Sequence, residues 1–552
     1  MPMSDDQGQQ IRKGSDLMEF MIRKDAPIVP HKKHWQFCVG SGHALLALRT
    51  DYTRQLKFIH DNLGIQRVRF HGIFNDDMRT CNSLSDLFEI DDAKNFREYN
   101  FHACGVAYDN VLDASMKPFV ELSFMPRHLM SQDENRAKEG GFYYKPLIVP
   151  PEDEQAWKDY IQAFIRFLIH RYSVEEVRTW YFEVWNEPDL QGAFFNGSRD
   201  EYFRMYEVTA RAIKEVDGQI PVGGPATSGS KWVKSFLHFC KENDVPVDFV
   251  TTHQYSGDPL GGVEDQGDPL SDGEGSAGFD IQAFLNSMGS KLKNARGKTM
   301  LDGLRAMMGD QSEERDIPND GFFRNSAIVR QQAGDMPLYY TEWNENSGFG
   351  SYTNDTRKVA AYDVKAALDV MDSMDGSSIW CFSDVFEEFH PFPEEFHGGF
   401  GMLTQNGIPK PVYHAMKMLA DAGDERLVLD EKATWGEIGI AAFKQEENLQ
   451  VLLFRQKMKN LDLPKEKAVV KIELPKEPNQ VLLRRVDEEH GNPLKLWESM
   501  GRPQDLNRQE VEELKRQSAV VDKPWPFVYE NGVLSLEAEL GVNDVYFFQI
   551  IR

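Results

Sequence analysis

The sequence predicts an α/β protein in which a (β/α)₈ TIM barrel is followed by a C-terminal β-sandwich domain. Eight short apolar, β-branched or aromatic runs follow one another between residues 34 and 384, separated by amphipathic segments. Parallel strands covered by helices read as near-continuous apolar runs, and eight strand–helix units close a barrel. After about residue 430, short alternating strands replace this rhythm, which is typical of a sandwich.

The barrel elements can be assigned in chain order. The predicted strands are HWQFCVG (34–40), RVRFHGIF (67–74), FVELSFMP (119–126), TWYFEVWNEP (179–188), IPVGGPAT (220–227), DFVTTHQY (248–255), PLYYTEWN (337–344) and SSIWCFSD (377–384). Residues 51–63 and 154–170 have apolar positions three or four apart, as amphipathic helices do. A doubly wound sheet shows the same alternation, but the nucleotide-binding glycine motifs of that fold are missing.

Three parts follow from this pattern. Residues 1–30 form an N-terminal segment that could add a strand to the sandwich, residues 31–425 form the barrel, and residues 426–552 form the sandwich. An acidic, glycine-rich insertion at about 257–320 interrupts the barrel after its sixth strand. At the active-site end of a barrel, such an insertion is a lid, an inter-subunit arm or a solvated loop, and the sequence leaves these open.

Charge and cysteine content exclude several classes of function. The chain has 62 basic and 88 acidic residues, a net charge of −26. This acidity argues against binding nucleic acid or anionic membranes but not against neutral substrates. The five cysteines lie far apart and form no CxxC pair, so neither a disulfide framework nor a zinc site is expected, and no cofactor is implied. The first apolar run is too short for a signal peptide, so we expect a cytoplasmic protein.

Two glutamates carry the strongest chemical signal. Glu187 follows the fourth predicted strand in the motif WNEP (185–188), and Glu342 ends the seventh in YTEW (340–343). A carboxylate at the end of a buried strand is costly unless it is used or paired. Because these strands lie across the barrel from one another, we expect the two carboxylates to face each other over its mouth.

Two opposed carboxylates are the minimal machinery for cleaving a glycoside. One protonates the leaving oxygen while the other attacks the anomeric carbon. We expect the charge of Glu342 to keep Glu187 protonated as the acid, and loss of that charge in the glycosyl-enzyme to free Glu187 as the base.

Further polar and aromatic residues are expected around this pair. Arg69 and His71 occupy alternate positions of the second strand, and His253 and Tyr255 do so on the sixth, so each pair shares a face. We expect Arg69 to keep the nucleophile ionised. Aromatic side chains near the strand ends supply faces on which a sugar ring can stack.

With these motifs the chain resembles glycoside hydrolase family 39 over roughly residues 25–550. The matching motifs are RFHGIFNDD (69–77), ELSFMP (121–126), YFEVWNEPDL (181–190), TTHQY (251–255), YYTEWN (339–344) and WCFSDVFEE (380–388). The resemblance implies a retaining enzyme with Glu187 as acid/base and Glu342 as nucleophile, a C-terminal sandwich and a homo-oligomer, often a tetramer. It implies sugar contacts from His71, Phe124, Asn186, His253, Tyr255, Trp380, Glu387 and Glu388, to which we add Arg69.

The resembling family contains β-D-xylosidases and α-L-iduronidases. Its iduronidases carry a lysine two residues after the strand-six histidine, where this chain has Tyr255. The eighth strand region carries Glu387 and Glu388, which would repel a uronate but can accept hydrogen bonds from neutral hydroxyls. The sequence therefore favours an exo-β-xylosidase that releases terminal non-reducing β-D-xylosyl residues from xylo-oligosaccharides.

Other functions stay open at this stage. An α-L-arabinopyranoside, a β-glucoside or, less favoured, an α-L-iduronide is an alternative substrate, and a non-catalytic carbohydrate-binding scaffold is the alternative outside enzymes. The chain departs from the resembling xylosidases at Gly348, where they tend to have a tyrosine, and Phe349 is expected to take over its packing.

Overall fold

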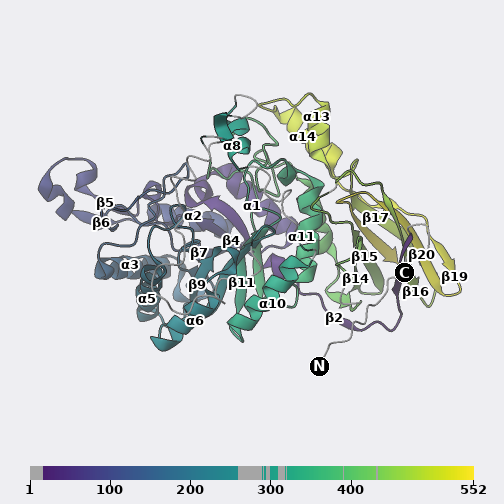
Figure 1. Cartoon of the computed structure of the whole chain (residues 1–552), viewed down its shortest axis with the longest axis horizontal. Coiled ribbons are helices and arrows are strands. Elements are labelled where there is room, and N and C mark those ends of the chain that lie inside the picture. The colour runs from purple at the N-terminus through teal and green to yellow at the C-terminus, as the bar shows by residue number, and fades with distance from the viewer. Residues whose placement is uncertain are drawn as a thin grey trace.

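The computed structural model describes residues 17–258, 289, 291–293, 299–308, 318, 320–389, 391–429, 433–459 and 461–552. Its centre is a closed barrel of eight parallel strands in chain order (Figure 1). The strands are β3 (Cys38–His43), β4 (Arg67–His71), β7 (Lys117–Glu121), β8 (Tyr181–Glu183), β9 (Val222–Thr227), β10 (Phe249–Tyr255), β11 (Leu338–Asn344) and β12 (Gly376–Ile379). The predicted barrel is therefore confirmed.

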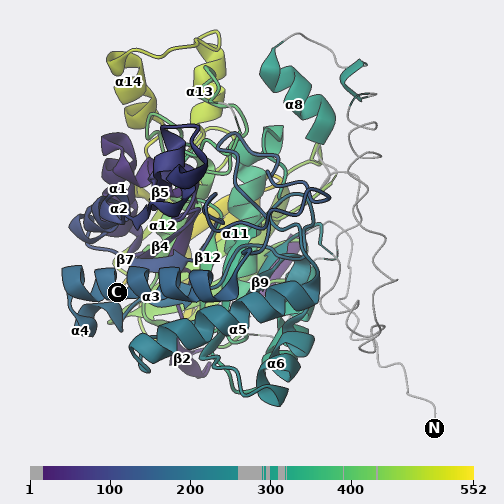
Figure 2. The same ribbon diagram turned by 90° about the vertical axis from the view of Figure 1, so that its left-hand side faces the viewer.

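Helices cover the outside of the barrel. They are α1 (Thr50–Leu63), α2 (His102–Asp113), α3 (Glu154–Tyr172), α4 (Val174–Val177), α5 (Arg199–Val216), α6 (Val233–Glu242), α10 (Gly321–Ala333), α11 (Arg357–Asp369) and α12 (Pro411–Asp421). Helix α8 (Met300–Met308) instead joins Phe349 and Trp380 in an apolar cluster. Helix α5 begins with a capping box, in which the Ser198 and Glu201 side chains each accept a backbone N–H. Figure 2 shows α3 and α5 lying side by side on the outer face.

An aromatic layer closes the N-terminal end of the barrel. Phe37 stacks on Tyr339 with ring centroids 4.5 Å apart, and Phe119 stacks on Tyr181 at 5.6 Å. Phe249 packs against both pairs from the first residue of β10. Because this end is filled, the polar residues at the opposite strand ends face the loops of the barrel mouth.

Two sheets form the sandwich. One has the order β1 (Leu17–Ile22), β16 (Glu466–Glu473), β20 (Val533–Leu540) and β19 (Val528–Glu530). The other has the order β18 (Lys523–Pro524), β17 (Gln480–Val486), β21 (Val545–Ile551), β15 (Asn448–Phe454), β14 (Gly439–Gln445), β13 (Glu425–Leu427) and β2 (Ile28–Pro30). The N-terminal segment thus adds two strands where one was predicted: β1 pairs in parallel with β16, and β2 pairs antiparallel with β13.

The seven-stranded sheet is buried on both faces. Ile440 and Leu453 belong to the core between the two sheets, whereas Phe443 and Leu452 join the core of the barrel. Alternate residues of a strand point to opposite faces, so one sheet serves both cores. The sandwich is consequently seated on the barrel, against α11 and α12 (Figure 1).

Several short strands and helices lie outside the barrel strands and the two sandwich sheets. The strands β5 (Cys81–Ser83) and β6 (Arg97–Tyr99) form a hairpin after β4. Helices α13 (Pro493–Ser499) and α14 (Arg508–Ser518) pack on Phe396 and Ile408. The remaining short helices are 3₁₀ turns: η1 (His34–Gln36), η2 (Ala44–Leu48), η3 (Asp76–Met78), η4 (Leu84–Asp86), η5 (Asp91–Asn95), η6 (Ser228–Ser230) and η8 (Tyr352–Asp355).

Most of the insertion predicted at 257–320 lies outside the described residues. Whether it is a lid, an inter-subunit arm or a solvated loop therefore stays open. Among the residues that are described, none of the helices has the length and apolar character needed to cross a membrane.

Candidate active site

Glu187 enters the barrel mouth from a strained turn after β8. Both Trp185, with φ 74°, and Glu187, with φ 39°, adopt a left-handed backbone conformation. For residues other than glycine this costs of the order of 1 kcal/mol or more, and such strain concentrates at functional sites. The turn is held by hydrogen bonds from Glu187 N–H to the Ala226 carbonyl (2.9 Å) and from Trp185 Nε1 to the Phe194 carbonyl (2.8 Å).

Burial favours the protonated form of Glu187. Its side chain is 9% exposed, and its Oε1 lies 2.9 Å from His253 Nδ1. Burial raises the pKa of Glu187 to about 8, with further contributions from the negative charges of Asp189 and Asp258. The predicted cause, the charge of Glu342, is wrong: desolvation has the largest effect on the pKa of Glu187, and Glu342 is not among the main causes.

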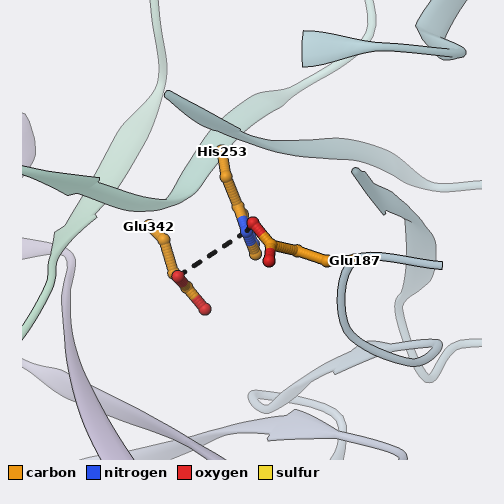
Figure 3. A group of neighbouring side chains, drawn as sticks. All are labelled: Glu187, His253 and Glu342. Atoms are coloured by element: carbon orange, nitrogen blue, oxygen red, sulfur yellow. Dashed lines mark hydrogen bonds and ion pairs between the residues drawn. The ribbon is translucent and has the colours of Figure 1, made fainter. Parts of the chain in front are cut away.

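Glu342 is held in one orientation by two donors. Arg69 Nη1 donates to its Oε1 at 2.8 Å, and the Tyr255 hydroxyl donates to its Oε2 at 2.8 Å. One carboxylate oxygen of Glu187, one of Glu342 and a ring nitrogen of His253 all lie within 4.8 Å of one another (Figure 3). The two predicted carboxylates therefore do meet across the barrel mouth.

Arg69 lies beneath the two carboxylates and is completely buried. Its guanidinium donates to Glu183 (2.5 Å), Glu342 (2.8 Å) and Asn186 Oδ1 (2.8 Å), and it also pairs with Glu121 at 2.8 Å. An enclosed guanidinium whose donors face these oxygens has little left to offer a sugar. We therefore assign Arg69 a positioning role in place of the predicted sugar contact.

His71 carries a positive charge inside the site. Its Nδ1 lies 2.6 Å from Glu121 Oε2, and its Nε2 lies 3.3 Å from Glu388 Oε1 and 3.6 Å from Glu342 Oε1. Burial opposes the charged imidazole, but the carboxylates of Glu121, Glu388 and Glu342 outweigh it and raise the pKa of His71 to about 9. The cation balances part of the negative charge of the pocket.

Two buried polar atoms beside the acid have no hydrogen-bond partner in the described part of the chain. They are Nδ2 of Asn186 and Nε2 of His253. Burial lowers the pKa of His253, which keeps its imidazole neutral. Unpaired buried polar atoms are rare in folded proteins, and here a substrate hydroxyl would satisfy them.

The other predicted contact residues divide into two groups. Phe124 and Trp380 are buried beside His71, with ring centroids 6.4 and 4.8 Å from its imidazole. Glu388 is buried, and burial raises its pKa to about 8. Glu387 instead pairs with Arg49, and its side chain is 29% exposed, so the structure does not bring it into this network.

Sequence reasoning did not assign roles to Glu121 and Glu183, the acids that hold Arg69 and His71. A signal was present, because each is a charge with apolar neighbours on both sides inside a strand run. Phe349 packs as expected next to Gly348: it is buried and stacks on Phe386 at 5.7 Å.

Among the described residues, Glu187, His253 and Glu342 form the only group of three side chains placed to hold a metal ion. His253 already hydrogen-bonds Glu187, and Arg69 and Tyr255 donate to Glu342. Such an arrangement suits proton transfer and nucleophilic attack, which need a protonated and an ionised carboxyl side by side.

Comparison with known proteins gives consistent results. The sequence model of glycosyl hydrolases family 39 matches residues 18–263 and 318–531. A β-xylosidase from Caldicellulosiruptor saccharolyticus is 35% identical over 520 residues, which cover 94% of this chain and 95% of that protein. A β-xylosidase from Geobacillus stearothermophilus is 34% identical over 527 residues, covering 94% and 93%.

Solved structures extend the likeness to the whole fold. The crystal structure of the GH39 enzyme from Xanthomonas axonopodis pv. citri has a TM-score of 0.76 at 26% identity, covering 98% of this chain and 99% of that one. A monomeric β-xylosidase from Caulobacter crescentus CB15 has a TM-score of 0.73 at 27% identity, covering 97% and 99%. From the extent of the family match and the identity with these relatives, the chain belongs to glycosyl hydrolase family 39.

Proposed function

We propose that this chain is a retaining exo-β-xylosidase that removes terminal non-reducing β-D-xylosyl residues from xylo-oligosaccharides. The observation that carries the proposal is the buried pair of Glu187 and Glu342, whose nearest carboxylate oxygens lie within 4.8 Å. Inversion needs a gap of roughly 6.5–9.5 Å to admit a water molecule between the carboxyl groups, so the shorter separation supports retention.

In the first step Glu342 attacks the anomeric carbon and the glycosidic C–O bond breaks. Arg69 and Tyr255 hold the attacking carboxylate in place. Glu187, with its pKa of about 8, is protonated at neutral pH and gives its proton to the departing oxygen. The products are the shortened alcohol and a xylosyl ester of Glu342.

In the second step water cleaves the ester. Glu187 is a carboxylate at the start of this step, because it has just given its proton to the departing oxygen. The Glu187 carboxylate then takes a proton from the water that attacks the anomeric carbon, and Glu342 leaves as a carboxylate. Two inversions at one carbon give net retention.

Substrate class follows from the charges around the pocket. Tyr255 uses its hydroxyl to hold Glu342, and the buried carboxyl of Glu388 lies close to His71. Neutral hydroxyls can pair with these groups, whereas the carboxylate of a uronate would need a cation, and both Arg69 and His71 already pair with carboxyl groups of the protein. The β-xylosidases that share about a third of this sequence over nearly its full length support the same substrate.

A parallel assay on aryl glycosides tests the proposal. The panel holds the β-D-xylopyranoside, β-D-glucopyranoside, α-L-arabinopyranoside and α-L-iduronide, each at several concentrations. We expect kcat/KM to be highest for the xyloside. A preference for any other member would overturn the assigned substrate, and inactivity on every member would favour a binding role.

A further inference from the structure

We propose that Tyr144 is a substrate-binding residue of this site, whose phenol hydroxyl hydrogen-bonds a hydroxyl of the bound glycone on the side formed by Glu388. Tyr144 lies in the long loop between β7 and α3, outside every motif discussed above. The inference rests on the proposed function, because the ligand is the sugar that the pair of Glu187 and Glu342 would cleave.

Stacking fixes the Tyr144 ring. It lies against His43 with ring centroids 4.3 Å apart and planes inclined by 16°, and against Phe142 at 5.9 Å and 10°. Phe124, one of the predicted sugar contacts, stacks on it at 6.2 Å. His43 is held in turn by Asp77, 2.6 Å from its Nε2. A ring packed between aromatic neighbours presents its hydroxyl in one direction at little entropic cost.

Backbone hydrogen bonds tie this loop to the pocket. The N–H of Tyr143 donates to the carbonyl of Glu388 at 2.8 Å, and Asn75 Nδ2 donates to the carbonyl of Tyr144 at 3.2 Å. Tyr144 is therefore coupled to the segment that carries Glu388, although about 240 residues separate the two in the sequence.

The Tyr144 hydroxyl is buried and has no hydrogen-bond partner among the described residues. Burial, followed by the charges of Glu388, Glu121, Asp77 and Glu342, raises its pKa well above the ordinary value, so the phenol stays protonated. Three of those four carboxyls belong to the network around the catalytic pair. A neutral hydroxyl beside them can both donate to and accept from a sugar hydroxyl.

Glu388 offers the complementary atom. Its Oε1 is buried and accepts no hydrogen bond within the described residues, although His71 Nε2 lies 3.3 Å away. A sugar hydroxyl between the two side chains would donate to Glu388 and accept from Tyr144. Because Glu187, Asn186 and Glu342 surround the anomeric end, we expect that hydroxyl to be the one at C3 or C4.

A buried, unpaired hydroxyl does not by itself make a binding residue. Tyr108, in α2 on the outside of the barrel, has one as well. Its ring packs against Phe70 and Trp180, in the layer between barrel and helices. What distinguishes Tyr144 is its contact with Phe124 and the backbone hydrogen bond that its neighbour Tyr143 makes to Glu388. Tyr108 therefore provides a matched control for removing a buried phenol oxygen.

The test combines Tyr144→Phe with deoxy substrates. Wild type and variant are assayed on aryl β-D-xyloside and on its 2-, 3- and 4-deoxy analogues. On the full substrate we expect kcat/KM of the variant to fall roughly 10- to 100-fold, the usual cost of an unpaired polar group in a sugar site. On the 3-deoxy or the 4-deoxy analogue the penalty should shrink to about 3-fold or less, because the partner is already gone. Tyr108→Phe should lose less than about 2-fold on every substrate.

Two results would overturn the inference: an unchanged kcat/KM for Tyr144→Phe, or an equal penalty on all four substrates. If Tyr144→Phe does not fold, a crystal structure of the wild type with xylose decides, since a Tyr144 oxygen more than 3.5 Å from every sugar hydroxyl excludes the contact. Failure of the proposed function is recognised separately, because wild type itself would then not hydrolyse the full xyloside.

Discussion

Arg69 and His71 set the electrostatics of the inner site. Each cation contacts two or more carboxyl groups, and Glu121 is shared by both. Removing one partner of such a buried cluster leaves an uncompensated charge, so each member depends on the others. Arg69 donates to the nucleophile Glu342, while burial raises the pKa of Glu187 to about 8, so Glu187 keeps its proton at neutral pH.

Glu187→Ala should separate the two chemical steps. A dinitrophenyl leaving group needs little protonation, so the variant should form the glycosyl-enzyme from such a substrate at a near-normal rate, yet lose about 10²–10⁴-fold on alkyl xylosides. Azide should raise its turnover, because the anion attacks without a general base. Steady-state rates with and without azide provide the measurement.

Glu342→Ala is the matched comparison, since it removes the other carboxyl of the pair. It should be inactive towards both leaving groups, and azide should not restore hydrolysis with retention of configuration. Equal inactivity of Glu187→Ala on both substrates, with no response to azide, would show that the acid/base is another residue.

The pH profile should report the proton on Glu187. The group donates only when protonated, so kcat/KM on an alkyl xyloside should fall as the pH rises through about 8, the value to which burial raises its pKa. On the dinitrophenyl xyloside this basic limb should be much weaker. A basic limb of equal size on both substrates would point to His71 or Glu388, whose pKa values are raised to about 9 and 8.

At the scale of single residues, the sequence was a better guide to the pair of acidic residues than to the side chains around them. Glu187 and Glu342 were recognisable because charge at the end of a buried strand needs a reason. Glu387 and Glu388 were not separable, because the left-handed backbone of Glu387, with φ 55°, decides which of the two neighbours turns inward. Tyr144 gave no signal, since its partners lie far away in the sequence.

At the scale of elements, loops from two neighbouring strands are joined by one buried lysine. Lys410 Nζ pairs with Asp355, after β11, and with Asp384, after β12, each at 2.6 Å. It also donates to the Gly399 carbonyl at 3.0 Å. Burial opposes the ammonium charge, but the two aspartates outweigh it and raise the pKa of Lys410. This contact fixes the segment that carries Trp380 and Glu388.

Lys410→Met should therefore lower the free energy of unfolding by about 3–5 kcal/mol, the usual cost of leaving buried charges unpaired. Urea denaturation measures the change. Lys417→Met is a control in the adjoining helix α12: its pair with Asp421 is partly exposed to solvent, with side chains 32% and 29% exposed, and we expect a loss of less than about 1 kcal/mol. Equal losses for the two variants would contradict the role assigned to Lys410.

Strand ends were less predictable than strand order. Each of the eight predicted barrel runs overlaps a barrel strand, because buried parallel strands are marked by their apolar composition. The run predicted at 179–188 nevertheless yields only Tyr181–Glu183, since Trp185 leaves the extended conformation to turn Glu187 into the mouth. Local composition does not reveal that turn. It is explained by the need to bring Glu187 into the barrel mouth.

At the scale of the whole molecule, strands β1 and β2 join strands from the last part of the chain in the sandwich. β1 covers the edge of β16, and Ile22 is buried in the core between the sheets. The predicted cytoplasmic location and homo-oligomer stay predictions, which cell fractionation and light scattering test.

Deleting residues 1–22 should lower the melting temperature and promote aggregation, because it removes an apolar strand and exposes the edge of β16. Deleting residues 1–16 alone removes none of the described strands and is the control. Calorimetry and light scattering measure both effects. If the two deletions behave alike, β1 is not needed to hold the sandwich together.

The most direct test of the central claim is to trap the glycosyl-enzyme. A 2-deoxy-2-fluoro β-xyloside with a dinitrophenyl leaving group should inactivate the protein, and mass spectrometry of the digested protein should locate the sugar on Glu342. An adduct on Glu187, Glu388 or any other residue would contradict the assigned nucleophile. The absence of an adduct, together with α-xylose as the first-formed product in NMR spectra, would contradict the retaining mechanism itself.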